Sequence, residues 1–268
     1  MEHSVQGESG NGREFDARRA PLIALFGVAQ MLVSGSAHAD AGPPMITDDP
    51  GTVPSGRWEI NVATLSGRSA DVTTFELPLV DINYGAGDRL QLKFEMPWVI
   101  LDPADGNTRS GAGNSLVGAK WHFFDGGEDG WQLATYPQIE STFPFARTAH
   151  GIADSGVRYL LPVEAQHAFG AFALNLEAGR WLRPAGQADS WIAGVVVSHE
   201  VRKGFTLLAE ARDEAGIGFH RDELIVDFGL HLDLSDHYSL LLSAGRDVHN
   251  GFAAPNTLLT YAAIQLHL

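Results

Sequence analysis

Cysteine is absent from the 268 residues, which excludes a disulfide framework and a thiolate metal site. Basic residues are scarce, with 18 Lys and Arg against 33 Asp and Glu and a formal net charge of −15, which argues against a nucleic-acid partner. The chain also lacks an apolar run of the about 20 residues that a membrane-spanning helix needs. These absences leave two classes open, a water-soluble sheet protein and a β-barrel in lipid, because barrel strands alternate apolar and polar residues.

Residues 89–98 carry the clearest pattern in the chain, Arg-Leu-Gln-Leu-Lys-Phe-Glu-Met-Pro-Trp. Its even positions are large and apolar, whereas most of its odd positions are charged or carry an amide. A period of two is typical of a strand with one apolar and one polar face. A sandwich strand would show the same alternation, so the recurrence of the pattern has to choose between the two classes.

Similar runs recur along the rest of the chain and predict about twelve strands. They cover residues 57–66, 72–84, 89–101, 114–124, 131–143, 156–164, 171–183, 190–201, 205–213, 223–234, 238–248 and 256–268. No composition shift divides them, so we expect one all-β domain over residues 57–268.

The predicted joins alternate in length. Short, turn-rich joins are expected at residues 85–88, 125–130, 165–170, 202–204 and 235–237, and mostly longer ones at 67–71, 102–113, 144–155, 184–189, 214–222 and 249–255. This alternation is typical of an up-and-down antiparallel transmembrane β-barrel, whose short turns face the periplasm. An even strand number would place both termini of the chain on that side.

The first 56 residues precede the strands. Arg18 and Arg19, an apolar run over 22–33 and the triplet Ala37-His38-Ala39 predict a leader and signal peptide over residues 1–39, cleaved after Ala39. The stretch before Arg18 is long for a signal, which is consistent with translation starting further downstream. Residues 40–56 contain four prolines and no periodicity, so we expect an irregular arm. Two placements stay open for this arm, a plug inside the barrel or a free segment in the periplasm.

The polar parity of the strands predicts the lumen of the barrel. The candidate lumen-lining residues are Arg89, Lys93, Glu95, Lys120, Glu140, Arg158, Glu177, Glu210, Arg212, Asp227, His231 and Asp233. In a sandwich the same residues would face water. Pro78, Pro137 and Pro162 lie inside predicted strands, and each of them requires a bulge or a rim position because a closed barrel has no free edge.

Eight large aromatic residues lie near the predicted strand ends: Trp58, Tyr84, Trp98, Trp121, Trp131, Trp181, Trp191 and Tyr238. Aromatic girdles occupy such positions in outer-membrane barrels, so we expect these side chains at the lipid interface. Packing inside a sandwich core is the alternative.

Several motifs resemble a proteobacterial outer-membrane β-barrel family labelled as transporters or as meta-pathway phenol-degradation proteins. In chain order they are Gly-Pro-Pro-Met-Ile-Thr-Asp-Asp-Pro at 42–50, Gly-Arg-Trp-Glu at 56–59, Gln-Leu-Lys-Phe-Glu-Met-Pro-Trp at 91–98, Gly-Ala-Lys-Trp at 118–121, Tyr-Pro-Gln-Ile-Glu at 136–140 and Leu-Ser-Ala-Gly-Arg at 242–246. The resemblance implies a barrel of about twelve strands that passes small, often apolar compounds. The family usually ends in an aromatic residue that the barrel assembly machinery reads, whereas this chain ends in Leu268.

Catalytic chemistry has weak support. His237 and Ser239 resemble the His-x-Ser pair of lipid A deacylases, but a short periplasmic turn is the wrong place for chemistry on an outer-leaflet lipid. His231 and Asp233 could pair as base and orienting group, yet no third metal ligand has a telling spacing. We therefore expect no cofactor, no metal and no enzyme, but an outer-membrane channel for passive passage of small molecules, apolar or aromatic ones included. Its partners would be membrane lipid, the assembly machinery and the solute; the alternative is a lipid-modifying enzyme or a barrel without transport.

Overall fold

The computed structural model describes residues 42–127, 130–146, 148, 151–183 and 188–268. The predicted signal peptide and its cleavage site lie outside these residues. The described elements are β1 (Trp58–Arg68), β2 (Val72–Gly85), β3 (Leu90–Pro103), β4 (Arg109–Ala112), β5 (Ser115–Asp125), β6 (Gln132–Thr135), β7 (Gln138–Ser141), β8 (Val157–Phe169), β9 (Phe172–Leu182), β10 (Ser190–Arg202), β11 (Phe205–Gly216), β12 (Asp222–Ser235), β13 (Tyr238–Asn250) and β14 (Leu258–His267). Among them there is no helix long and apolar enough to cross a membrane, a finding that does not bear on membrane crossing by strands.

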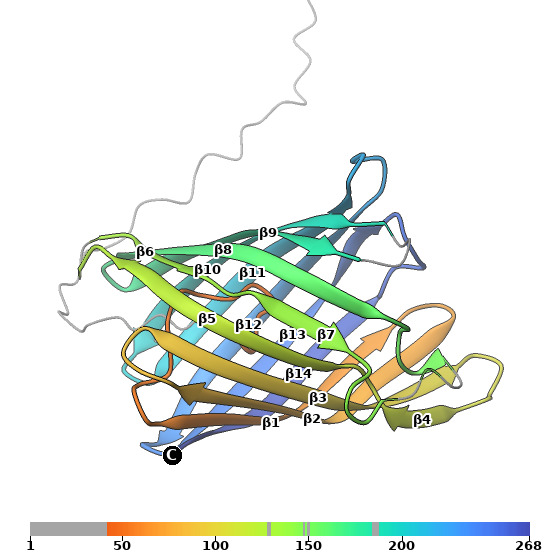
Figure 1. The fold of residues 1–268 in the computed structure, drawn as a ribbon, viewed down its shortest axis with the longest axis horizontal. Coiled ribbons are helices and arrows are strands. Elements are labelled where there is room, and N and C mark those ends of the chain that lie inside the picture. The colour runs from red at the N-terminus through yellow and green to blue at the C-terminus, as the bar shows by residue number, and fades with distance from the viewer. Residues whose placement is uncertain (1–41, 128–129, 147, 149–150, 184–187) are drawn as a thin grey trace, which may run out of the picture. The chain divides into compact units, whose positions relative to one another are not determined.

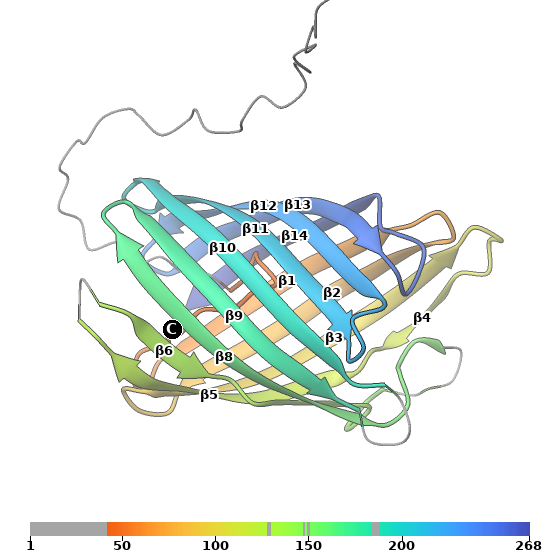
Figure 2. The ribbon, with the colours of Figure 1, turned by 90° about the horizontal axis from the view of Figure 1, so that it is seen from above.

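The strands form one closed antiparallel ring (Figures 1 and 2). Each strand pairs with its neighbours in the chain, and β1 pairs with β14 over ten residue pairs to close the ring. β4 and β5 both pair with β3, and β6 and β7 both lie between β5 and β8, so each of these two pairs is one strand with a break. The fourteen segments therefore make twelve barrel strands, which confirms the predicted fold class.

The three prolines are accommodated by irregular pairing, as the ladder requires. Pro78 lies where the registers of β2 shift against both β1 and β3. Pro137 lies in the break between β6 and β7, and the opposite strand places Pro162 next to the same break. Because a proline has no N–H to donate, positions where a neighbouring ladder is already interrupted accept these residues while the ring stays closed.

Alternation sorts the side chains into an inner and an outer face. On β3, Gln91 is buried, whereas its neighbour Leu92 is 45% exposed on the outside. Strands β9 and β10 repeat the pattern, with Asn175 and Val196 buried and Trp191 exposed. An exposed apolar band around a ring of buried polar side chains is the arrangement that a barrel in a lipid bilayer requires.

The two ends of the barrel differ in their joins. At one end, which we call the turn end, residues 86–89, 126–131, 170–171, 203–204 and 236–237 connect the strands. At the other, the loop end, residues 69–71, 104–108, 142–156, 183–189, 217–221 and 251–257 do so. Three predicted joins were wrong. Residues 165–169 continue β8, and residues 109–112, inside the join expected over 102–113, form β4. The join expected over 67–71 is only three residues long, because the ladder of β1 with β2 extends to Arg68.

Candidate functional site: an arm inside the barrel

Residues 42–56, which we call the arm, enter the barrel from the turn end and lie within the ring of strands (Figures 1 and 2). At the turn end the arm is held by Gly56, whose N–H donates to the carbonyl of Gly85 at 2.8 Å. Deeper inside, Met45, Thr47 and Asp49 are buried. Since the arm has no ladder of its own, its backbone groups need partners on the inner barrel wall.

Lys120 on β5 is the cationic anchor of the arm. Its Nζ donates to Oδ1 of Asp48 at 2.7 Å and to the carbonyl oxygen of Asp49 at 2.6 Å. The same ammonium lies 3.9 Å from a carboxylate oxygen of Glu164 and 4.9 Å from the ring centroid of Tyr136. A buried lysine is stable only when paired, so this set of contacts ties the arm to β5 and β8.

Glu210 on β11 binds the arm from the opposite wall. Its two carboxylate oxygens accept the N–H of Ile46 at 2.9 Å and the N–H of Thr47 at 2.6 Å. Nearer the turn end, Oε1 of Gln91 accepts the N–H of Val53 at 2.9 Å. The arm is therefore bound at three levels of the barrel, and two of them involve charged groups.

Three glycines on the inner wall allow the arm to approach the backbone. A Cβ on Gly194 would lie 2.0 Å from Oγ1 of Thr47, and one on Gly229 would lie 2.3 Å from Cε of Met45. A Cβ on Gly85 would lie 2.1 Å from the carbonyl oxygen of Pro54. None of the three glycines is among the predicted site residues, although a glycine inside a strand is a recognised sign of close approach by another backbone.

The structure places most of the candidate lumen residues on the inner face, several of them as ion pairs. Lys93 lies 2.9 Å from Glu95, Arg212 lies 2.6 Å from Glu177, and Arg158 contacts Glu140. Glu210, Asp227, His231 and Asp233 share this face with Lys120. Arg89 is different, since it is exposed in the join before β3 and not in the wall of the lumen.

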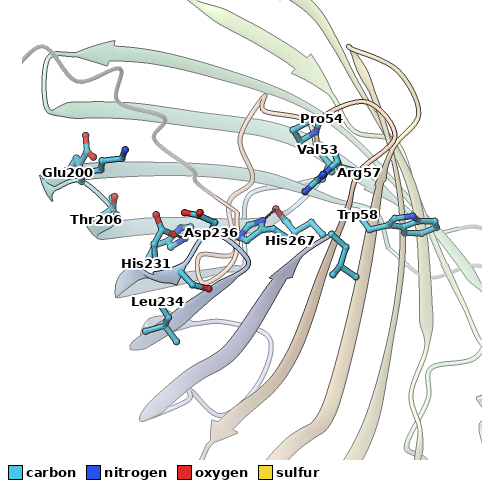
Figure 3. A pocket seen from close by; sticks show the side chains of 16 residues that line it. Val53, Pro54, Arg57, Trp58, Glu200, Thr206, His231, Leu234, Asp236 and His267 are labelled. Atoms are coloured by element: carbon cyan, nitrogen blue, oxygen red, sulfur yellow. Dashed lines mark hydrogen bonds and ion pairs between the residues drawn. The ribbon is translucent and has the colours of Figure 1, made fainter.

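A cavity of about 750 Å³ opens at the turn end (Figure 3). It lies between the arm, at Val53 and Pro54, and the ends of β10, β11, β12 and β14. His231, Asp233 and His267 contribute to its lining. The cavity has a mixed polar character and forms a vestibule at the end of the barrel where the arm enters.

The His-x-Ser pair singled out in the sequence is not assembled. Oγ of Ser239 instead donates to Oδ1 of Asp233 at 2.8 Å and lies 3.2 Å from Nε2 of His267. His231 and Asp233, which the sequence allows to pair, are in contact at 3.1 Å. Ser239 is fully buried, so its oxygen is not accessible as a nucleophile, and no group of three His, Asp or Glu in the described residues could hold a metal ion.

Trp181 corrects the predicted aromatic girdle. It is buried on the inner face of β9, where the guanidinium of Arg158 lies 4.3 Å from its ring centroid. An indole that stacks on a cation is stable in a polar lumen, and the alternating pattern of β9 turns this position inward. Trp58, Trp98, Trp121, Trp131, Trp191 and Tyr238 are exposed.

An ion-pair cluster lies at the loop end, where β9 ends and β10 begins. Asp189 accepts the backbone N–H of Arg183 at 2.9 Å and the guanidinium of Arg180 at 2.8 Å. These donors lower the pKa of the Asp189 carboxyl from its ordinary value. These contacts favour the ionised form of the Asp189 carboxyl.

Comparisons with known proteins bear on the fold. No protein-family model and no curated protein matches the sequence. A crystal structure of an outer membrane channel from Pseudomonas putida F1 superposes with a TM-score of 0.69 at 13% identity, over 82% of this chain and 98% of that one. The NanC porin superposes with a TM-score of 0.55 at 11% identity, over 77% of this chain and 98% of the porin. The chain therefore has the fold of outer-membrane β-barrel channels and porins.

Proposed function

We propose that this protein is an outer-membrane channel for passive passage of small molecules, and that the arm is a plug that closes its lumen. The observation that carries the proposal is the arm itself, bound inside the closed ring by Lys120, Glu210 and Gln91. A water-soluble sandwich would rarely expose a continuous apolar band on its outer surface.

The barrel size supports a narrow passage. Eight strands leave an interior that side chains fill, whereas 16 or more leave a wide aqueous channel, so about twelve enclose a space that a short peptide can block. Once the arm withdraws, the polar inner face can hold water and can offer hydrogen-bond partners to a passing solute. The family resemblance of the arm and of β3 extends the proposal to apolar and aromatic solutes.

The orientation belongs to the same proposal. We place the turn end, with the vestibule, on the periplasmic side, because short turns face the periplasm in outer-membrane barrels. Export would use the signal peptide predicted over residues 1–39, with cleavage after Ala39, and insertion would use the barrel assembly machinery.

Deletion of residues 41–54 tests the channel and the plug together. The deletion removes the arm but keeps the signal and β1, so we expect a barrel with higher single-channel conductance and faster solute-dependent swelling of liposomes than the full chain. A gel-shift on heating shows whether each protein is folded. A folded deletion variant with the conductance of the full chain would refute the plug, and a barrel that passes no solute in either form would refute the channel.

A further inference from the structure

The part of the arm that lies deepest in the barrel occupies a patch with its own chemistry. Six inner-face residues of β9 to β12 form this arm patch: Asn175, Val196, Ser198, Leu208, Glu210 and Asp227. They are neighbours in the ladder, since Val196 is opposite both Asn175 and Glu210, and Glu210 is opposite Asp227. The patch lies midway along its strands and is therefore in the path of any molecule that crosses the barrel.

One half of the patch is apolar and contains a recess above Gly229, which we call the crater. Val196 and Leu208 form a buried cluster with Met45 of the arm. The crater exists because Gly229, the ladder partner of Leu208, has no side chain, and Cε of Met45 fills the space where a Cβ would stand. An apolar chain or ring of similar thickness can occupy the same space.

The other half is acidic. Both oxygens of Glu210 accept hydrogen bonds, and both donors are neutral backbone N–H groups of the arm. The neighbouring Asp227 is buried, and one of its oxygens accepts from Oγ of Ser243 at 3.1 Å. Within the described part of the chain neither carboxylate forms an ion pair with a lysine or arginine. Two adjacent buried carboxylates with neutral donors alone would gain from a cation, because a buried charge is costly unless an opposite charge pairs with it.

Two further polar groups beside the crater are unused. Asn175 is fully buried and neither its amide nitrogen nor its amide oxygen has a hydrogen-bond partner in the described residues. The same is true of the hydroxyl of Ser198, which is opposite Leu208 in the ladder. Buried polar groups are nearly always hydrogen-bonded, so these two mark a place where a polar molecule belongs.

We propose that the arm patch is a solute-binding site for an apolar or aromatic molecule that carries a protonated amine, and that residues Pro44–Thr47 occupy it until such a molecule displaces them. The arm mimics this solute, with Met45 as its apolar part and the N–H groups of Ile46 and Thr47 in place of an ammonium. An ammonium has three donors and can satisfy Glu210 and Asp227 together. This proposal rests on the proposed channel function, and it names the class of molecule that the channel selects.

Calorimetric titration of the purified full chain in detergent at pH 7 tests the site with three probes of one shape. They are 2-phenylethylamine, 2-phenylethanol and phenylacetate, which differ in the charge of the head group. We expect the amine to bind at least about tenfold more tightly than the alcohol, and the acid not to bind. Equal affinities for the amine and the alcohol, or tighter binding of the acid, would overturn the proposal.

Variants locate the binding. Glu210→Gln and Asp227→Asn should each remove most of the preference for the amine over the alcohol, whereas Asp88→Asn, in the exposed join before β3, should keep it. The ratio of two affinities is the readout because Glu210→Gln also weakens the arm, which affects both probes alike. Met45→Ala should tighten amine binding about tenfold, since it weakens the competitor and leaves the acid pair intact. An unchanged ratio in folded Glu210→Gln and Asp227→Asn would overturn the site.

The failures of the two proposals are distinguishable. If the arm deletion raises conductance but the full chain shows no amine preference, the channel stands and the site falls. If the amine binds with the expected preference but neither form conducts, the site stands as a ligand pocket and the channel falls.

Discussion

At the scale of single residues, the ammonium of Lys120 is the cationic contact of the arm. It bonds two successive arm residues and is otherwise surrounded by Glu164 and Tyr136. If the arm withdrew, this lysine would keep Glu164 as a partner, so the barrel wall remains paired in both states. The arm side of the contact is therefore the better place to change.

Asp48→Asn should loosen the arm without disturbing the barrel. The substitution keeps the size of the side chain but removes the negative charge that contacts Lys120. A hydrogen bond to a charged group contributes about 1.5 to 3 kcal/mol. We expect the open probability in planar bilayers to rise about tenfold or more. Asp71→Asn, in the join of residues 69–71, is the matched control and should conduct like the unmodified chain. No change in the Asp48 variant would show that the contacts of Asp49, Glu210 and Gln91 hold the arm without this ion pair.

Asp189 predicts a pH dependence at the loop end. Its pKa is lowered in the folded chain, so the stabilisation it supplies is complete above its ordinary pKa of about 3.9 and is lost as the pH falls through the lowered value. We expect the temperature of the gel-shift on heating to fall below about pH 4 in the unmodified chain, and Asp189→Asn to remove part of that fall. An identical pH profile in the two proteins would contradict a role for this cluster.

At the scale of the elements, alternation decides which substitutions lipid tolerates. Leu92→Arg would place a cation against hydrocarbon and should cost about 2 to 4 kcal/mol near the membrane midplane. Leu92→Met keeps an apolar side chain of similar volume and should cost little. Yields of folded barrel from refolding in liposomes measure the difference, and equal yields would argue against a lipid-facing β3.

The neighbouring Gln91 requires a different expectation. An arginine there would be harmless in an empty lumen, but Gln91 is buried and donates to Oδ1 of Asn83 while accepting from the arm. Gln91→Arg should therefore displace the arm before it affects the strands.

Gly194→Val tests the fit of the arm against β10. The new side chain would occupy the space of Thr47, whereas a β-branched residue suits the strand itself. We expect a folded barrel with raised conductance, similar to that of the arm deletion. Ala193→Val places the same side chain on the outer face, one residue earlier in β10, and should conduct normally. Normal conductance in the Gly194 variant would mean that the arm does not need this approach.

At the scale of the whole molecule, the two ends of the barrel should differ in access from outside the cell. An epitope inserted between Gly106 and Arg109 lies at the loop end and should be labelled on intact cells. One inserted at Gly87 lies at the turn end and should be labelled only after the membrane is opened. The reverse pattern would invert the proposed orientation and would place the vestibule of Figure 3 on the outside.

The sequence alone determined the class of fold, the number of strands and the face that each strand turns inward. These properties are local: a period of two assigns each side chain to a face, and turn residues mark the ends, without any knowledge of distant contacts. The prediction for Trp181 was wrong because it used the residue type, although the alternation of β9 turns this position inward. The prediction for Arg89 was wrong because β3 begins one residue later, at Leu90.

Only the tertiary structure decided where the arm lies. Its deepest contacts join residues more than 70 positions apart, such as Asp48 with Lys120 and Thr47 with Glu210. A proline-rich segment without periodicity carries no local record of such partners. The partners also look like ordinary lumen residues until the ring closes and brings β5, β10, β11 and β12 around a single short peptide, because ring closure, and not any single strand, creates the space that the arm fills.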